Sequence, residues 1–328
     1  MSLKVGLTFD LRSYYLAQGY SPDDVAEFDS DATIDALERT IRALGYATDR
    51  IGNGRMLCQR LVAGDRWDLV FNIAEGMGGR SREAQVPCLL ELYGIGYALS
   101  DPLVCAVTLE KNVAKQIVRA DGLRTPEFRV VRQAADIADV RLRYPLFAKP
   151  IAEGTGKGVD TRSKIDNPQQ LDEVCRALLA NYRQAVLVEE YLPGREFTVG
   201  LIGTGPGARV IGTMEIEMLP HAQTEIYTYQ VKEECEKLVR YSAPARDALR
   251  AAVEDLALRS YRALECRDAG RVDVRLDRDG LPSFMEVNPL PGLHPQHSDL
   301  PMIATQEGMS YADLIGGIIQ SACSRLGI

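Results

Sequence analysis

The sequence predicts an α/β region followed by two α+β regions, and three observations lead to this prediction. Strands and helices alternate along residues 1–105, which is typical of a parallel sheet with helices packed against it. Residues 106–195 place a Gly-rich loop between two strands and then add a helix and another strand. Residues 196–328 hold several strands, a long helix and a final strand pair. We therefore expect three domains, 1–105, 106–195 and 196–328.

The first domain opens with a strand at 3–9 and has a second apolar strand at 67–76. Apolar residues at helical spacing predict helices over 31–46, 55–62 and 82–94. The Gly-rich turn before the last of these helices leaves backbone N–H groups free, so an anion site is one interpretation of it. A plain strand–helix connection is the other interpretation.

The second and third domains follow a different order. One helix is predicted over 101–122, with Lys111 in its middle, and an extended segment follows it. Asn167 as N-cap and Pro168 at the first helical position predict the start of a helix that runs to 182. The remaining predicted elements are strands flanking a loop within 144–165, strands within 185–203 and 209–219, a helix over 245–265, a hairpin over 271–288 and a final helix.

The hairpin places charged side chains inside a sheet. Asp279–Gly280 is a strong signal for a two-residue turn, because such turns need positive φ angles. This turn gives two polar cross-strand pairs, Asp273 with Glu286 and Arg271 with Asn288. Alternation along the strands then puts six side chains on one face: Arg271, Asp273, Arg275, Phe284, Glu286 and Asn288. The expected core face holds Val272, Val274, Leu276, Met285 and Val287.

Two carboxylates directly opposite each other repel, so something must compensate their charge. A shared proton, the neighbouring arginines and a bound cation are three ways to do so. Asp, Glu and Asn supply the oxygen ligands that suit Mg²⁺ held together with substrate phosphates. The alternative is a solvated outer face with ordinary Arg–carboxylate pairs.

Composition excludes several classes of protein. The 328 residues are 46% hydrophobic and 26% charged, which is typical of a globular chain of two or three domains. A net charge of −8 without a long Lys/Arg run argues against nucleic-acid binding. We see no signal peptide and no apolar stretch of membrane-spanning length. Seven scattered cysteines without a C-x-x-C pair indicate free thiols of a reducing compartment, and three histidines are too few and too poorly spaced for a zinc site.

The Gly-rich loop EGTGKG covers residues 153–158 and is not a Walker A loop. That motif needs Ser or Thr after its Lys and a helix after the loop, whereas Gly158 and a strand follow Lys157 here. A Gly-rich loop between two strands is either an ordinary turn or a flap whose N–H groups cover phosphates. The lysines Lys111 and Lys149, together with the acidic pair, favour the flap.

Together these motifs resemble the ATP-grasp superfamily and, within it, the D-alanine–D-alanine ligases. The resemblance spans nearly the whole chain and is strongest from about Phe71 onward. The segments that carry it are VFNIAEG, QVPCLLELYGIGYALSDPL, TLEKNVAK, FAKPIAEGTGKGV, VLVEEYLPGREFTV, IYTYQVK, GRVDVRLD and MEVNPLPGL, in the order and spacing of that family. The resemblance implies a three-domain ATP-grasp fold with a parallel α/β N-terminal domain, and an ATP-dependent ligase that works through an acylphosphate.

The resemblance also implies roles for single residues. Lys111 and Lys149 correspond to lysines on the α- and β-phosphates of ATP. The phosphate flap corresponds to Glu153, Gly154, Thr155, Gly156, Lys157 and Gly158. The hinge whose backbone binds adenine corresponds to Glu189, Glu190, Tyr191 and Leu192, and Glu196 resembles the carboxylate that binds the ribose. Asp273, Glu286 and Asn288 resemble the ligands of two Mg²⁺ ions, with Mn²⁺ as an alternative metal.

Three further residues correspond to groups that act on the reacting atoms. Arg271 resembles the arginine that stabilises the transition state, and Gly292 resembles the backbone donor beside it. Lys232 resembles the lysine of a loop around 227–232 that closes over the γ-phosphate and excludes water. Ser298 is similar to the serine that holds the carboxylate of the second substrate.

The amino-acid half of the family pattern is altered. The family has Gly-Gly-x-Ser-x-Glu after its first strand, where this chain reads TFDLRSYYLAQGYSPDD, and no residue matches the Glu that holds the first substrate's ammonium. Glu75 or Asp10 is a candidate for that role, and a structural role is equally open for each. The other departures are Glu75 in place of a His, Thr155 in place of the flap Ser, Glu233 in place of a Tyr, and one residue inserted before Ser298.

The leading hypothesis is therefore a ligase of the D-alanine–D-alanine ligase type. A ligase of a specialised pathway that joins a different amino acid or dipeptide is the second, and a nucleotide-binding regulator without turnover is the third. The resemblance implies a cytoplasmic enzyme of cell-wall synthesis with amino-acid substrates. It also suggests a homodimer formed through the N-terminal region.

Overall fold

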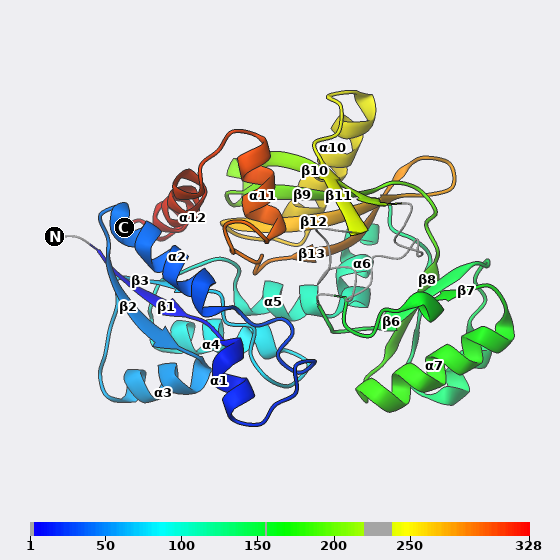
Figure 1. Ribbon diagram of the computed structural model, residues 1–328, viewed down its shortest axis with the longest axis horizontal. Helices are drawn as coiled ribbons and strands as arrows, with labels where there is room; N and C mark the ends of the chain where they lie inside the picture. Colours follow the sequence, from blue (N-terminus) through cyan, green and yellow to red (C-terminus); the bar gives the residue numbers. More distant parts are fainter. Residues whose placement is uncertain (1–2, 155, 220–237) are drawn as a thin grey trace.

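The computed structural model describes residues 3–154, 156–219 and 238–328, which form three sheets with helices around them (Figure 1). The N-terminal sheet has the order β2-β1-β3-β4 and is parallel throughout. Its strands are β1 (Lys4–Thr8), β2 (Ala47–Gly52), β3 (Leu69–Asn72) and β4 (Tyr97–Ala98). The predicted parallel α/β layer is confirmed, although β2 was missed, since its burial alternates weakly and four of its six residues are polar or Gly.

Alternate residues of β3 pack on opposite faces of this sheet. Leu69 and Phe71 join a core with α2 (Asp31–Ala43) and α12 (Tyr311–Leu326), while Val70 joins a core with α3 (Gly54–Val62) and α4 (Gln85–Leu92). The last helix of the chain therefore covers the first sheet, and both termini lie at this end of the molecule (Figure 1). Short helices α1 (Arg12–Ala17) and η1 (Arg82–Ala84) complete this region.

The second sheet is antiparallel, in the order β5-β8-β6-β7. Its strands are β5 (Phe128–Val131), β6 (Leu146–Pro150), β7 (Lys164–Ile165) and β8 (Val186–Glu190), accompanied by η2 (Ala134–Asp139), η3 (Thr161–Ser163) and α7 (Pro168–Tyr182). The Asn167 side chain accepts a hydrogen bond from the backbone N–H of Gln170, so the predicted cap of α7 is confirmed.

The third sheet is antiparallel, in the order β11-β10-β9-β12-β13. Its strands are β9 (Glu196–Ile202), β10 (Arg209–Met218), β11 (Val239–Ser242), β12 (Ala269–Leu276) and β13 (Pro282–Asn288), with η4 (Gly205–Gly207) between β9 and β10. Helices α6 (Lys111–Ala120) and α10 (Ala248–Ala263) cover one face of this sheet, and α11 (Asp299–Gln306) covers the other. The single final helix of the prediction is thus two helices.

The helix predicted over 101–122 is also two helices, α5 (Pro102–Leu109) and α6. Glu110 between them has a ψ of 85° and leaves the helical conformation. The N–H of Lys111 then bonds to the carbonyl of Ile151 rather than within a helix. Because apolar spacing continues across the break, the sequence pattern could not reveal it. Lys111 consequently starts α6 instead of lying in the middle of a helix.

The hairpin register is right at the polar pairs and wrong toward the turn. Arg271 faces Asn288 and Asp273 faces Glu286 as predicted, but Leu276 pairs with Pro282. The turn has three residues, 278–280, with Gly280 at a φ of 76°, and one extra residue on β13 restores the register before Glu286.

That extra residue, Met285, is a β-bulge, which lets two successive side chains point to the same side. Phe284 is consequently fully buried in the core, and Met285 lines a cavity on the polar face. The prediction that placed Phe284 with the polar side chains and Met285 in the core is therefore wrong.

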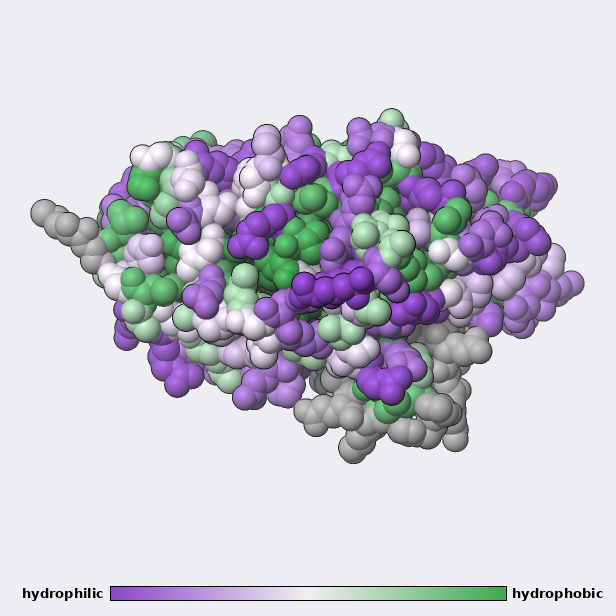
Figure 2. Space-filling model, turned by 90° about the horizontal axis from the view of Figure 1, so that it is seen from above, coloured by the Kyte–Doolittle hydropathy of each residue, from purple (hydrophilic) through white to green (hydrophobic). Residues whose placement is uncertain are grey.

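Figure 2 shows hydrophilic side chains over most of one face of the molecule, with hydrophobic residues gathered toward its middle. Across the described residues, no helix has both the length and the apolar character needed to cross a membrane. The six described cysteines are free thiols in the structure.

Candidate active site

Lys111 and Lys149 meet at the carboxylate of Glu286. Lys149 lies near the end of β6, and its Nζ lies 3.3 Å from Glu286 Oε2. Lys111 Nζ lies 3.8 Å from the same oxygen and donates a hydrogen bond of 2.5 Å to the carbonyl of Glu153. Two strands and the start of α6 thus bring the predicted phosphate lysines to one predicted metal ligand.

A buried row of alternating charges extends from these lysines into the protein: Glu286, Lys149, Glu189 and Lys115. Glu189 on β8 is fully buried and pairs with Lys149 at 3.4 Å and with Lys115 at 3.0 Å. Lys115 lies one turn after Lys111 on α6, and its Nζ also donates to Thr125 Oγ1 at 3.1 Å. Burial lowers the pKa of Lys115 to about 8 against the opposing pull of Glu189.

The same row of charges shifts the pKa values of Lys149 and Glu189. Burial alone would lower the pKa of Lys149, but the carboxylates of Glu189 and Glu286 outweigh burial and raise it. Burial alone would raise the pKa of Glu189, but Lys115 and Lys149 outweigh burial and lower it. Lys115, Glu189 and Lys149 are thus held in their charged forms near neutral pH, and Lys149 has a carboxylate on each side.

Arg271 is clamped between two carboxylates on the polar face of the hairpin. Its Nε lies 3.1 Å from Asp273 Oδ1, and its Nη1 lies 2.5 Å from Asp299 Oδ2. Burial would lower the pKa of Arg271, but Asp273 and Asp299 outweigh burial and raise it. The guanidinium group of Arg271 is therefore permanently charged and is held in position by a carboxylate on each side.

The predicted metal ligands have the donor chemistry for Mg²⁺. Asp273 and Glu286 face each other across the strands, and Asn288 lies two residues beyond Glu286 on β13. Within the described part of the chain, no three His, Cys, Asp or Glu side chains form a metal cluster. Two carboxylates and an amide fit an ion that takes most of its ligands from phosphate oxygens and water, which is the usual arrangement for Mg²⁺.

The predicted flap folds back over these groups. The Glu153 carboxylate accepts a hydrogen bond from Gln184 Nε2 at 2.6 Å and lies 3.4 Å from Lys157 Nζ. Gly158 has a φ of 76°, and an added Cβ there would lie 2.5 Å from Pro150, so only glycine fits. The backbone N–H of Gly154 bonds to the carboxylate of Glu27, which ties the flap to the N-terminal domain. Thr155 lies outside the described residues, as does Lys232 with its loop.

A small cavity of about 110 Å³ gathers the predicted phosphate and metal groups. Its lining includes Lys111, Lys149, Glu153, Gly156, Lys157, Glu196, Arg271, Asp273 and Glu286. Glu196 Oε2 is held by Arg275 Nη1 at 3.2 Å. The predicted hinge residues, Glu189, Glu190, Tyr191 and Leu192, do not line this cavity, although Tyr191 stacks on Phe147, which does.

A second cavity of about 240 Å³ adjoins the first and shares Lys111, Arg271 and Glu286 with it. It holds both predicted substrate residues, Glu75 and Ser298, together with Gly292 and Asn288. Ser298 Oγ accepts a hydrogen bond from the N–H of His294 at 3.0 Å, and an added Cβ at Gly292 would lie 2.8 Å from that Oγ.

Asp10, the other candidate for binding an ammonium group, lines neither cavity. Its carboxylate accepts hydrogen bonds from Tyr15 Oη at 2.7 Å and from the N–H of Gly76 at 2.8 Å. These contacts give Asp10 a structural role at the end of β1.

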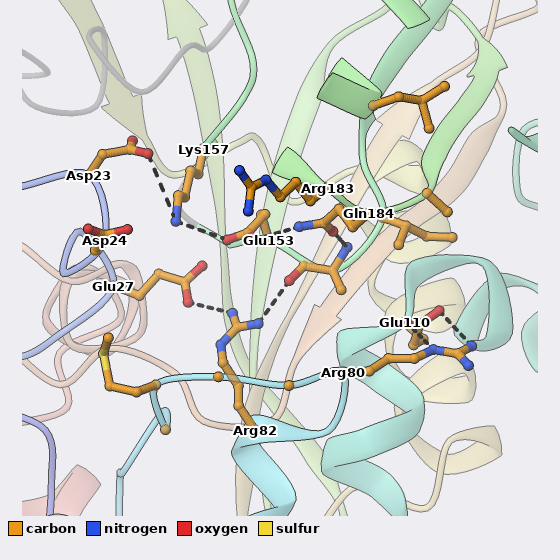
Figure 3. Close-up of a pocket in the computed structure, with 18 of the residues that line it drawn as sticks. Asp23, Asp24, Glu27, Arg80, Arg82, Glu110, Glu153, Lys157, Arg183 and Gln184 are labelled. Carbon is orange, nitrogen blue, oxygen red and sulfur yellow. Dashed lines mark hydrogen bonds and ion pairs between the residues drawn. The ribbon is translucent and has the colours of Figure 1, made fainter. Parts of the chain in front are cut away.

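A larger cavity of about 740 Å³ lies on the other side of the flap (Figure 3). Glu27 and Arg82 point toward each other in it and form an ion pair at 2.5 Å, while Lys157 lies between Glu153 and Asp23 (Figure 3). The predicted metal ligands and the predicted transition-state residue Arg271 do not line it, so its size does not make it the candidate reaction site.

Sequence reasoning missed Lys115, Asp299, Glu27 and Glu83. Lys115 had a usable signal, since it stands four residues after Lys111 and so shares a helix face with it. Asp299 had a weaker one, as an acid in the first turn of a helix. Glu27 and Glu83 carried no signal, because only the folding of two loops places them beside the cavity.

Comparisons with known proteins agree on one family. Residues 117–320 match the family model described as D-ala D-ala ligase C-terminus. The chain is 36% identical over 276 residues to a D-alanine–D-alanine ligase of Bordetella petrii, covering 83% of this chain and 80% of that protein. It is 35% identical over 259 residues to the protein y4sG of Sinorhizobium fredii, covering 78% and 75% of the two chains.

The fold has a counterpart among solved structures. The structure of D-alanine–D-alanine ligase from Bacillus anthracis complexed with ATP superposes with a TM-score of 0.76. The two chains are 23% identical, and the match covers 99% of this chain and 98% of the other. At that identity the likeness shows the fold alone, and it confirms the ATP-grasp fold that the resemblance implied.

Proposed function

Because this chain belongs to the D-alanine–D-alanine ligase family, we propose that it is an ATP-dependent ligase that joins the carboxylate of one amino acid to the amine of another. The observation that carries this proposal is the border shared by the two cavities. Lys111, Arg271 and Glu286 line both, so a phosphate group in one cavity lies beside a substrate in the other. That arrangement suits transfer of a phosphoryl group to a carboxylate.

In the first step, an oxygen of the first substrate's carboxylate attacks the γ-phosphorus of ATP. The bond from that phosphorus to the bridging oxygen breaks, and ADP leaves with the electron pair. Lys111 and Lys149 bind phosphate oxygens and offset their charge, which is most of what phosphoryl transfer requires of a protein. Glu189 and Glu286 keep Lys149 charged and fixed for this role.

In the second step, the neutral amine of the second substrate attacks the carbonyl carbon of the acylphosphate. The bond from that carbon to the phosphate oxygen breaks, phosphate leaves, and the nitrogen loses one proton. Arg271 and the N–H of Gly292 stabilise the oxyanion that forms at the carbonyl, a role in which one donor contributes about 10²–10³ in rate. Ser298 binds the carboxylate of the second substrate, and Glu75 contributes to binding the ammonium of the first.

Asp273, Glu286 and Asn288 would hold two Mg²⁺ ions, or Mn²⁺ in their place, which neutralise charge on the triphosphate. The facing pair of carboxylates supports this assignment, because their repulsion is relieved by a cation. Arg271 supplies part of the same compensation through Asp273.

The backbone of Glu189, Glu190, Tyr191 and Leu192 is proposed to bind adenine, and Glu196 the ribose. Ligand pockets usually measure about 300–1,000 Å³, and the nucleotide cavity measures about 110 Å³. We therefore expect the flap to move away from Lys111 when ATP enters. The assignments of Thr155 to the flap and of Lys232 to the γ-phosphate lie outside the described residues.

The identity of the amino acids is the open part of the proposal. The relative from Bordetella petrii is named a D-alanine–D-alanine ligase, which makes a D-Ala-D-Ala ligase of cell-wall synthesis the first candidate. The altered residues around Glu75 favour a second candidate, a ligase of a specialised pathway with a different first substrate. A nucleotide-binding regulator without turnover is disfavoured, because Arg271 and the proposed metal ligands Asp273, Glu286 and Asn288 are all present in the sequence.

The test is phosphate release from Mg²⁺-ATP with single amino acids and pairs, D-alanine included, and with product masses read alongside. Release with D-alanine and a D-Ala-D-Ala mass would identify a cell-wall ligase. Release with another pair alone would identify a different ligase. ATP binding without phosphate release under every substrate would overturn the proposal and support the regulator.

The division into domains 1–105, 106–195 and 196–328 remains part of the proposal, as does a cytoplasmic location, which the free thiols support. A homodimer through the N-terminal region is also proposed. Three large apolar side chains are exposed there on consecutive, contacting helices: Val62 at the end of α3, Leu92 on α4 and Leu103 on α5. Light scattering on the intact chain would decide the oligomeric state.

A further inference from the structure

The second cavity has more negative charge than the chain compensates. Five carboxylates line it: Glu27, Glu75, Glu83, Glu286 and Asp299. Three of these have cationic partners, since Glu27 pairs with Arg82, Glu286 with Lys111 and Lys149, and Asp299 with Arg271. The side-chain carboxylates of Glu75 and Glu83 have no hydrogen bond or ion pair to any residue that the structure describes, although the backbone N–H of Glu75 bonds to Asp10.

Of these two residues, Glu83 gives the clearer evidence of an uncompensated carboxylate. Its residue is 7% exposed, it lies on the short helix η1, and its side chain borders the cavity. The charged groups around it are Arg82, Glu27, Lys111 and Glu75, and Arg82 already pairs with Glu27. A buried charge without a partner costs several kcal/mol, so this end of the cavity favours the arrival of positive charge.

Burial, together with the neighbouring carboxylates, raises the pKa of both side chains, that of Glu83 to about 7 and that of Glu75 well above its usual range. Both carboxyl groups thus take up a proton more readily than an exposed carboxyl group does, and a bound cation would displace that proton. An ordinary amino acid brings one ammonium group, which compensates one carboxylate. A second cationic group on the same substrate would compensate the other.

We propose that the first substrate is a diamino carboxylic acid, whose two ammonium groups bind Glu75 and Glu83 while its carboxylate reaches Lys111 and Arg271. This inference rests on the proposed ligase function and narrows it to a class of substrate. The cavity of about 240 Å³ is lined by Glu75 and Glu83 as well as by Lys111 and Arg271, so a single small molecule bound there has both sets within the same cavity. A monoamino acid leaves one of these buried carboxylates without a cation.

The experiment compares matched pairs of amino acids in both chiral forms. Lysine is paired with norleucine, ornithine with norvaline, and 2,4-diaminobutyrate with 2-aminobutyrate, each as the first substrate in ATP-dependent phosphate release by the intact chain. We expect at least one diamino acid to exceed its monoamino partner by about 10-fold or more in kcat/KM, as one added buried ion pair implies. Binding of the same pairs without ATP, measured by calorimetry, should show the same order.

Two variants localise the effect. Glu83→Gln and Glu75→Gln are each expected to lower the diamino-to-monoamino ratio about 10-fold, because one cation loses its partner. Glu173→Gln, on the exposed face of α7, is the matched control and should keep the ratio of the parent chain. Circular dichroism of each variant shows whether it is folded.

The outcomes separate the two proposals. Phosphate release with monoamino acids that equals or exceeds release with their diamino partners would overturn this inference and leave the ligase function standing. A diamino preference that survives both glutamine variants would also overturn it. No phosphate release with any amino acid, despite ATP binding, would overturn the ligase function itself.

Discussion

Replacing Lys115 by Met removes a buried positive charge that lines neither of the two adjoining cavities. Lys115 is fully buried and lies 3.0 Å from Glu189, which in turn holds Lys149. Met has nearly the volume of Lys, so the substitution leaves the packing close to native. The substitution therefore tests whether the ion pairs that join Lys115, Glu189 and Lys149 stabilise the fold and hold Lys149 in position.

The expected magnitude follows from the geometry. At 3.0 Å and an effective dielectric constant of about 20, the attraction between Lys115 and Glu189 is about 5 kcal/mol. Burial of the lysine offsets part of this, as its lowered pKa of about 8 indicates. Removing one partner of a buried pair costs about 3–5 kcal/mol, and Glu189 keeps Lys149, so we expect about 3 kcal/mol.

The assay is urea unfolding followed by circular dichroism, together with the KM for ATP. Lys149 must then compensate Glu189 alone, so we expect the KM to rise about 10-fold, equivalent to about 1.4 kcal/mol. Lys4→Met is the matched control, because Lys4 forms a half-exposed ion pair with Asp49 at 3.2 Å and should cost less than about 1 kcal/mol.

A double variant tests whether the loss of stability comes from the unpaired charge on Glu189 rather than from altered packing. Lys115→Met combined with Glu189→Gln leaves no unpaired charge at this position and should recover most of the lost stability. If the single variant loses no more free energy of unfolding than the Lys4 control, the stabilising role of these ion pairs is refuted. The same conclusion follows if the double variant is no more stable than the single one.

Four further predictions concern the site and the hairpin. Arg271→Met should lower kcat about 10²–10³-fold and spare Mg²⁺-ATP binding in calorimetry; equal losses in both would contradict its transition-state role. Asp273→Asn with Glu286→Gln should abolish the Mg²⁺ dependence of nucleotide binding, and an unchanged titration would place the metal elsewhere. Phe284→Ala should lower the free energy of unfolding in urea by about 3–5 kcal/mol, because the ring is fully buried. A loss below about 1 kcal/mol would indicate that the ring lies on the polar face. The pKa of Glu83, raised from 4.5 to about 7 by burial, contributes stability that is present below pH 4.5 and lost as the pH rises through 7; Glu83→Gln should flatten this loss, and identical profiles would speak against it.

The hairpin shows how far sequence reasoning reaches. The predicted turn at Asp279–Gly280 placed Asp273 opposite Glu286, and alternation placed both side chains on one face; the structure agrees on the pair. The predicted two-residue turn was wrong, and the bulge at Met285 compensated the error before the register reached the site. A bulge adds one residue without changing the composition of the strand, so the pattern could not separate a short turn from a longer turn plus a bulge.

The sequence by itself determined the parallel α/β region at the N-terminus, the α+β character of the rest and the family, because periodicity, turn residues and motif order are local properties of the chain. It also brought the lysines, the flap and the metal ligands into one hypothesis, and the cavity gathers most of them. Only the tertiary structure decided what those groups touch. The ion pair of Lys115 with Glu189, the clamp of Asp299 on Arg271 and the two unpaired glutamates of the second cavity join segments far apart in the chain. Burial sets the charge and strength of such contacts, and burial depends on how the three sheets pack together.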